Sequence, residues 1–295
     1  MRSLVGGVAL AAAACQAPGA HDTLAALRPA CGEPRYWDGH ACQPRGDAAD
    51  KVEEGRRALA KLDLDAARAA LTAAEAGGPL RHDTHVALWE QRGIAAAYVN
   101  DTQGASAAFD MMIALDPGHF LSYTLSPKAT FVFEKARGER QAGGLPALDV
   151  SWPHEPRVGD AVPIELSVRA DPKQFLRRAT LFVRARGDAS WRAADVELAA
   201  HGDRRLSLPP VTADKPVALQ LYLRAYDARG NEVLTWADPA QPRELPLRYD
   251  PPVPWYRRTW VIVTGLAVVG LAAGATVYEL TQTPPDRITG GVTVR

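Results

Sequence analysis

The sequence lacks a surplus of charge of either sign, because its 295 residues contain 34 Lys plus Arg and 34 Asp plus Glu. A chain without a basic surplus has no overall positive field for nucleic acid, so we expect no nucleic-acid partner. The sequence also lacks the motifs GxxxxGK[ST], GxGxxG after a strand, and GxSxG. These absences argue against a phosphate-cradling loop, a dinucleotide-binding fold and a serine-hydrolase nucleophile.

Metal-ligand patterns are absent as well. No CxxC pair occurs, and His40 is the sole further candidate ligand near the closest cysteines, which disfavours a zinc site. The segment "HDTH" sets two histidines three apart, whereas HExxH needs a spacing of four and an adjacent glutamate. We interpret it as a polar loop in which Asp83 or Thr84 caps the next helix. The sequence therefore predicts no metal site, no cofactor, no catalytic residue and a chain that is not an enzyme.

Cysteine is scarce, with three residues in the whole chain. Cys31 and Cys42 are eleven positions apart, with the turn formers Gly32, Pro34 and Gly39 between them. We predict a small disulfide-closed loop within a linker, residues 16–46, which requires an oxidising compartment. The alternative is two free thiols in a disordered linker.

The N-terminus, residues 1–15, has the layout of a secretory signal peptide. Arg2 supplies a positive charge, Leu4–Ala14 is too short to span a bilayer, and small residues precede Cys15. The pattern is similar to a bacterial lipoprotein signal, in which this cysteine is lipidated, although Ala12 stands where leucine is usual. We predict export and lipidation of Cys15; the alternative is an alanine-rich helix that stays attached.

A long uncharged run lies near the C-terminus. Trp260–Tyr278 contains no Asp, Glu, Lys or Arg, and its nineteen residues are enough to cross the hydrocarbon of a bilayer. We predict a transmembrane helix over 256–279 with a short tail, residues 280–295; the alternative is a buried core helix. Gly270 and Gly274 form a small-xxx-small face through which two such helices can associate.

Two signals disagree about membrane topology. Export and a disulfide place residues 16–255 outside the cytoplasm. Arg257 and Arg258, just before the span, would instead keep that part inside by the positive-inside rule. We give the export signal more weight, because a late span stops transfer largely through its apolar character. The prediction is a single-pass protein of a bacterial cell envelope with its large domains in the periplasm.

Residues 47–137 have a helical pattern that repeats. Gly55 and Gly93 are 38 positions apart, as are Leu71 and Phe109. Two antiparallel helices approach closely where small residues leave room, and large residues fill the space between neighbouring repeats. A further helix is predicted after "SPK", with Ser126 as its cap and the following proline at its first position.

The second copy, "LWEQRGIAAAYVNDTQGASAAFDMMIALDP", resembles the tetratricopeptide repeat. That family places a large residue, glycine, alanine, an aromatic residue and proline at set positions, which match Trp89, Gly93, Ala105, Phe109 and Pro117. Arg92 and Ala96 depart from the family pattern, and the first copy, residues 48–81, lacks the tryptophan and the proline.

The resemblance implies a concave groove that binds a partner protein. Carried over by position, its residues are Val52, Arg56, Glu90, Ile94 and Tyr98. The alternative for Ile94 and Tyr98 is burial against the terminal helix.

Residues 147–250 alternate like strands. In "VALQLYLRAY", Leu219, Leu221 and Leu223 share one face, and the residues between them share the other. About seven such strands suit an antiparallel β-sandwich, similar to immunoglobulin-like or fibronectin-III-like domains; the alternative is a small β-barrel. The pairs Arg177–Arg178 and Arg204–Arg205 are interpreted as solvated strand ends.

The predicted fold class is therefore multidomain α + β: helical hairpins, a β-sandwich and one C-terminal transmembrane helix. The predicted function is a non-enzymatic envelope scaffold for protein–protein contacts, with a periplasmic partner. One alternative is a structural or cell-wall glycan-binding module. Another is a cytoplasmic adaptor anchored by its C-terminal span.

Overall fold

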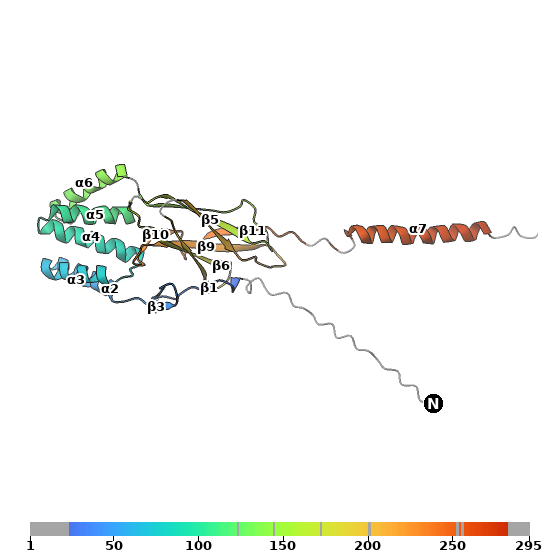
Figure 1. Ribbon diagram of the computed structural model, residues 1–295, viewed down its shortest axis with the longest axis horizontal. Helices are drawn as coiled ribbons and strands as arrows, with labels where there is room; N and C mark the ends of the chain where they lie inside the picture. The colour runs from blue at the N-terminus through green and yellow to red at the C-terminus, as the bar shows by residue number, and fades with distance from the viewer. Residues whose placement is uncertain are drawn as a thin grey trace, which may run out of the picture. The chain divides into compact units, whose positions relative to one another are not determined.

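The computed structural model describes residues 24–122, 124–143, 145–171, 173–199, 202–251, 254 and 257–282. The signal-peptide prediction and Cys15 lie outside these residues. The chain divides into two compact units, one ending at Tyr249 and the other beginning at Asp250. In the first unit the helices gather at one end and the strands at the other (Figure 1).

The helical end consists of the helices that the periodicity predicted. Their bounds are α2 (Ala48–Ala60), α3 (Leu64–Gly77), α4 (His82–Tyr98), α5 (Thr102–Leu115) and α6 (Pro127–Gly143).

Glycine allows close helix contact in both halves of the repeat. Helix α2 packs on α3, and α4 packs on α5. A Cβ atom on Gly55 would lie 2.7 Å from the Leu71 side chain, and one on Gly93 would overlap the Phe109 ring. These are the positions that the 38-residue period pairs, so each glycine makes room for a large side chain of the next helix.

The turns within the two halves also match. Leu62 and Asn100 both have positive φ, 60° and 65°, and each stands just before a helix N-cap. The caps are Asp63, whose carboxylate accepts from the Ala66 N–H, and Asp101, whose carboxylate accepts from the Gly104 N–H. A carboxylate at this position satisfies an N–H group that the helix leaves unpaired.

Helix α6 begins at Pro127, as predicted. The Ser126 hydroxyl accepts from the Lys128 N–H at 3.4 Å. The helix packs on α5, where the rings of Phe133 and Phe109 meet edge to face with centroids 5.6 Å apart.

The strands form two larger antiparallel sheets and one small hairpin. The first sheet has the order β1-β7-β6-β9-β10, and β11 also pairs with β9; the second has the order β4-β5-β8; β2 pairs with β3. The bounds are β1 (Arg28–Pro29), β2 (Arg35–Trp37), β3 (Cys42–Pro44), β4 (Ala147–Ser151), β5 (Val162–Ala170), β6 (Arg178–Ala185), β7 (Arg192–Glu197), β8 (Gly202–Leu208), β9 (Val217–Tyr226), β10 (Glu232–Trp236) and β11 (Arg243–Leu247).

Alternate residues of both sheets meet in one buried core. Ile164 and Leu166 of β5 belong to the same cluster as Leu181 of β6 and Leu221 of β9. The period of two therefore predicted the inward faces correctly, and the arrangement is compatible with a β-sandwich.

The helical and strand parts join where the chain enters α4. The Glu232 N–H donates to the Leu80 carbonyl at 2.9 Å, and the Leu80 N–H donates to Asn231 Oδ1 at 2.9 Å. A Cβ atom on Gly78 would lie 2.7 Å from that amide oxygen, so this approach requires glycine. The two parts consequently share one compact unit.

The start of α4 corrects one prediction. His82 and His85 are helical, and no side chain caps the helix at its N-cap residue, Arg81. The "HDTH" segment is thus not an inter-helix loop capped by Asp83 or Thr84. Glu232 of β10 takes that role, because its carboxylate accepts from the His82 N–H at 3.3 Å.

The second unit contains helix α7 (Thr259–Gln282). Its stretch Thr259–Tyr278 is long and apolar enough to cross a membrane, judged by length and composition. None of that stretch is buried within the chain, which distinguishes it from a core helix.

Candidate functional site

The candidate site begins with the disulfide-closed hairpin β2–β3. Cys31 and Cys42 are joined by a disulfide. At the tip of the hairpin, Asp38 Oδ1 accepts from the N–H groups of His40 and Ala41, both at 2.7 Å. These two backbone hydrogen bonds lower the pKa of Asp38 to about 2. The tip is therefore fixed by an ionised carboxylate at any physiological pH.

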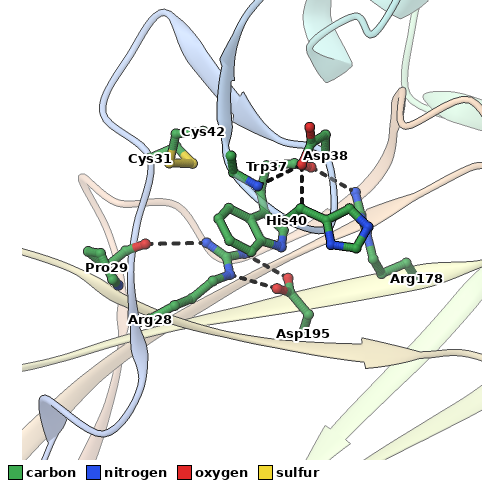
Figure 2. Close-up of a disulfide and its surroundings, with 10 residues drawn as sticks. Arg28, Pro29, Cys31, Trp37, Asp38, His40, Cys42, Arg178 and Asp195 are labelled. Carbon is green, nitrogen blue, oxygen red and sulfur yellow. Dashed lines mark hydrogen bonds and ion pairs between the residues drawn. A yellow bond between two sulfur atoms is a disulfide. The ribbon is translucent and has the colours of Figure 1, made fainter.

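Arg28 ties this segment to the first sheet (Figure 2). It belongs to β1, which pairs with β7 through Arg28 and Ala193. Its guanidinium donates to both carboxylate oxygens of Asp195 at 2.6 and 2.7 Å, and it stacks 4.4 Å from the Trp37 ring centroid. One side chain thus connects the sheet to the hairpin through a bidentate ion pair and a ring contact.

Asp195 is ionised at neutral pH despite its burial. Burial opposes the charge, but hydrogen bonds from Arg28 and from the Thr180 hydroxyl outweigh it and lower the pKa of Asp195. The Thr180 bond is 2.6 Å long. Arg178 adds a further link, because its guanidinium donates to the Trp37 carbonyl at 3.2 Å.

Aromatic rings cover the outward face of β6 and β9. Phe182 and Tyr222 are register partners and stack with centroids 4.4 Å apart and planes 5° from parallel. Trp191 meets Tyr222 edge to face at 4.6 Å. Burial raises the pKa of Tyr222 well above its usual value and raises that of Tyr226 to about 12. These rings form a neutral, largely buried cluster under the outward face.

Two arginines stack on rings of this face without a carboxylate partner. The Arg184 guanidinium lies 4.2 Å from the Trp191 centroid, and that of Arg178 lies 5.2 Å from the Tyr226 centroid. Among the described residues, both hydrogen-bond to neutral oxygens. Neither forms a close ion pair among the described residues, although the charge of Arg178 also helps to lower the pKa of Asp195.

A cavity of about 530 Å³ lies between the hairpin and this face. We call it the arginine–aromatic cavity. Its wall contains Cys31 and Trp37 from the hairpin side, and Trp191 and Tyr222 from the sheet. The arginines in its lining are Arg28, Arg35, Arg45, Arg178, Arg192 and Arg224.

The cavity carries a surplus of positive charge. Glu232, whose side chain is 2% exposed, accepts from both Arg45 at 2.8 Å and Arg224 at 3.1 Å. With Asp195 and the lining residue Glu33, three carboxylates pair with three of the six lining arginines, Arg28, Arg45 and Arg224. Counted over these nine residues, the formal surplus is three positive charges. Arg45 Nε is in addition buried without a hydrogen-bond partner among the described residues.

This arrangement suits non-covalent recognition of an anion. Guanidinium groups match carboxylate and phosphate oxygens with fixed, forked hydrogen bonds, and ring faces accept a flat or apolar group. Within the described residues, no group of three or more His, Cys, Asp or Glu could hold a metal ion.

The residues predicted to line the helical groove differ in how deeply they are buried. Val52 and Ile94 are 4% and 7% exposed and pack in the interior, so neither faces a partner. Tyr98 is partly buried and packs against the main core. Arg56 is exposed and pairs with Glu53, and Glu90 is half-buried with its carboxylate 3.1 Å from His119 Nε2.

The residues of the arginine–aromatic cavity were not predicted as a site. Arg178 was interpreted as a solvated strand end, but it is half-buried in the cavity wall because the hairpin covers that end of β6. The sequence does contain a pattern that could have indicated this site. Phe182 and Arg184 alternate with apolar residues in β6, and Tyr222 and Arg224 do so in β9. Bulky aromatics at outward positions indicate a covered face rather than a solvated one.

Comparisons with known proteins leave the family open. No protein-family model matches the sequence, and no curated protein matches it. Among solved structures, a cohesin module of a family 33 glycoside hydrolase from Clostridium perfringens is similar at 12% identity. The alignment covers 36% of this chain and 97% of that one, with a TM-score of 0.24.

A CARDB domain of a Pyrococcus furiosus protein, solved in complex with di-metal ions, is similar at 14% identity. Here the alignment covers 35% of this chain and 93% of that one, also with a TM-score of 0.24. Scores this low carry no argument about function, which rests instead on the residues described above.

Proposed function

We propose that this chain is a non-enzymatic, membrane-anchored protein of a bacterial cell envelope that holds a partner protein at the membrane. The observation that carries the proposal is the arginine–aromatic cavity, with its surplus of positive charge and the aromatic side chains in its lining. Arginine, tyrosine and tryptophan are the residue types that dominate the binding energy of protein interfaces.

The helical part would act as a tetratricopeptide-like support. The shared 38-residue period, the matched glycine contacts and the matched turns at Leu62 and Asn100 favour two copies of one unit. Any partner contact of this part would involve Arg56 and Glu90, because Val52 and Ile94 are buried.

Helix α7 would serve as the anchor. Its length and apolar composition support a single span, and Gly270 and Gly274 would offer a face for self-association. A disulfide in the hairpin favours an oxidising compartment, so the first unit would be periplasmic. Removal of the residues before Cys15 and lipidation of Cys15 complete the proposal.

A second candidate is binding of a cell-wall glycan, and the same cavity favours it. Flat aromatic faces also suit sugar rings, and arginines suit their acidic substituents. The two candidates differ in the molecule that contacts the cavity wall in the cell: a partner protein in the first and a cell-wall glycan in the second.

Site-specific photo-crosslinking would separate them. A photoreactive phenylalanine analogue would replace Tyr36, which lines the cavity, in the full chain expressed in cells. The matched control is the same replacement at Phe131 of α6, an exposed aromatic outside the cavity lining. We expect a protein adduct at Tyr36 and none at Phe131; an adduct with glycan alone, or no adduct, would contradict the proposal.

A further inference from the structure

We infer that the arginine–aromatic cavity binds one compact oxyanion group, a carboxylate or a phosphate, through the guanidinium groups of Arg178 and Arg35. The inference rests on the proposed function, because it names the chemical group that the same site recognises. A free small anion and an acidic group on the partner protein both supply this chemistry, and the experiment below separates the two sources.

Arg178 has donors left for a ligand. Its Nη2 donates to the Trp37 carbonyl at 3.2 Å, and its guanidinium lies 5.2 Å from the Tyr226 ring centroid. Its other two nitrogens, Nε and Nη1, have no acceptor among the described residues, and neither is a buried atom. Carboxylate and phosphate oxygens are the acceptors that such guanidinium N–H groups match best.

Arg35 supplies a second cation to the same cavity. It lines the cavity from the beginning of β2, it is exposed, and its side chain has no partner among the described residues. All of its N–H groups are therefore available to a ligand.

Two further arginines raise the positive potential beside Arg178. Arg45 and Arg224 donate to the same oxygen, Oε1 of Glu232, at 2.8 and 3.1 Å. Arg178 and Arg224 are diagonal neighbours on β6 and β9, because Arg178 is the register partner of Tyr226. Such neighbours lie about 7 to 8 Å apart. Three guanidinium groups from separate segments thus surround one directly bonded carboxylate, so a further negative group in the cavity is favoured electrostatically.

The other two carboxylates beside the cavity do not take this place. Asp195 accepts from Arg28 and forms no close ion pair with Arg178 among the described residues. Glu33 lies 3.9 Å from Arg224 and likewise forms no ion pair with Arg178 there. An oxyanion in the cavity would give Arg178 the carboxylate or phosphate partner that it otherwise lacks.

The dimensions of the cavity suit a small ligand or a single group of a larger one. Its volume is about 530 Å³, and ligand sites usually enclose roughly 300–1,000 Å³. Tyr36 and Trp37, both half-buried, line it on the hairpin side. Aromatic walls of this kind reduce the water around a bound anion and so strengthen its attraction to the arginines.

Calorimetric titration of the purified full chain in nonionic detergent tests the inference. The probes are citrate and pyrophosphate, which present carboxylate and phosphate oxygens, and trimethyl citrate, which has the carbon skeleton of citrate without its charge. We expect saturable binding of at least one of the two anions, weakening as sodium chloride is added, and no binding of trimethyl citrate.

Protein variants assign the binding to the cavity. Arg178→Gln should weaken binding of that anion about ten- to hundredfold, the range for a hydrogen bond between charged groups. Arg35→Gln breaks no side-chain contact of the described residues, so its fold should be unchanged. It should weaken binding about two- to fivefold, as for an exposed ion pair.

The matched control is Arg184→Gln. Arg184 is six residues from Arg178 on the same strand and also stacks on a ring, that of Trp191, but it does not line the cavity. At the rise of a strand the two backbones are about 20 Å apart. Arg184→Gln should therefore bind the anion like the unchanged chain.

Failure of this inference and failure of the proposed function give different results. If neither anion binds, or if Arg178→Gln and Arg35→Gln bind it unchanged, the inference is overturned. It is also overturned if Arg184→Gln weakens binding as much as Arg178→Gln, because the anion would then respond to the charge of the whole face. In each of these cases a protein adduct at Tyr36 would still support the proposed function.

Competition identifies the source of the group. The anion that binds is added to permeabilised cells during crosslinking from Tyr36. A reduced adduct means that the partner protein supplies the oxyanion, and an unchanged adduct means that the ligand is a free anion; both retain the inference. A chain that binds the anion as expected but gives no adduct at Tyr36 would retain the inference and overturn the proposed function.

Discussion

Glu232 is one carboxylate with three separate partners. It is 2% exposed, accepts from Arg45 of the N-terminal segment and Arg224 of β9, and accepts the His82 N–H at the start of α4. A carboxylate this deeply buried is stable only because the surrounding donors replace its hydration. Removing its charge leaves Arg45 without an ion-pair partner among the described residues, and leaves Arg224 with the longer pair to Glu33 at 3.9 Å.

We therefore expect Glu232→Gln to lower the free energy of unfolding by about 3 kcal/mol, the lower end for breaking a buried ion pair. Urea denaturation of the full chain in nonionic detergent, followed by tryptophan fluorescence, measures this. The control is Glu165→Gln, because Glu165 pairs with Arg205 on the surface and should contribute less than about 1 kcal/mol. Equal losses in the two variants would contradict the role assigned to Glu232.

His85 makes stability depend on pH. Burial lowers the pKa of His85, and its Nδ1 lies 3.1 Å from the Glu232 carbonyl oxygen. In the unfolded chain a histidine titrates near pH 6.5, so below that pH the unfolded state binds more protons than the folded one. The contribution of neutral His85 is fully present above about pH 6.5 and is lost as the pH falls.

The measurement is the thermal midpoint at pH 7.5 and at pH 5.5. We expect His85→Gln to have a smaller drop between the two than the unchanged chain, because glutamine does not titrate. His154→Gln, at an exposed loop position, should keep the full drop. A drop that survives in His85→Gln would assign the pH dependence to other groups.

At the scale of elements, replacement by alanine is expected to have opposite effects on stability at Gly93 of α4 and at Gly138 of α6. A Cβ atom on Gly93 would overlap the Phe109 ring, whereas one on Gly138 has nothing within 4 Å. Gly93→Ala should therefore cost about 1–3 kcal/mol through overpacking. Gly138→Ala should stabilise α6 by about 0.5–1 kcal/mol, because alanine loses less backbone entropy in a helix.

Urea midpoints of the two variants check this pair. Opposite shifts are expected. If Gly93→Ala also raised the midpoint, α4 and α5 would not be in the close contact that the glycine allows.

The same elements show what periodicity predicts well. The spacing of Gly55, Gly93 and Phe109 indicated helices packed in pairs, and Pro127 marked the start of α6, because these features are local or repeat at a fixed distance. Alternation gave the inward faces of β5, β6 and β9 for the same reason.

What covers an outward face does not follow from periodicity. The hairpin at Cys31 and Cys42 lies far from β6 and β9 in sequence, so nothing local indicated that Arg28 would bind Asp195 across 167 residues. The beginning of α4 was likewise misjudged, because its N–H acceptor comes from Glu232, 150 positions later. Long-range polar pairs of this kind depend on the assembled fold and carry little local signal.

At the scale of the whole molecule, the disulfide and the span make one joint prediction about compartment. Cys31 and Cys42 are bonded in the first unit, and α7 supplies a candidate span after it. If the first unit lies outside the cytoplasm, its thiols are unavailable until they are reduced and then react from outside. The positively charged pair Arg257 and Arg258 before α7 favours the opposite orientation, with the first unit in the cytoplasm. Labelling of the thiols from outside the cytoplasmic membrane discriminates between these two orientations.

A membrane-impermeant maleimide, applied to cells whose outer membrane has been made permeable, distinguishes these arrangements. We expect Cys31 and Cys42 to be labelled after reduction and not before, with no labelling of the Cys31→Ser/Cys42→Ser variant. In that variant, Thr293→Cys should be labelled once the cytoplasmic membrane is breached, because the C-terminal tail would be inside. If Cys31 and Cys42 instead react only after breaching and need no reductant, the envelope proposal fails. The chain would then be an adaptor on the cytoplasmic side, and the arginine–aromatic cavity would meet its partner there.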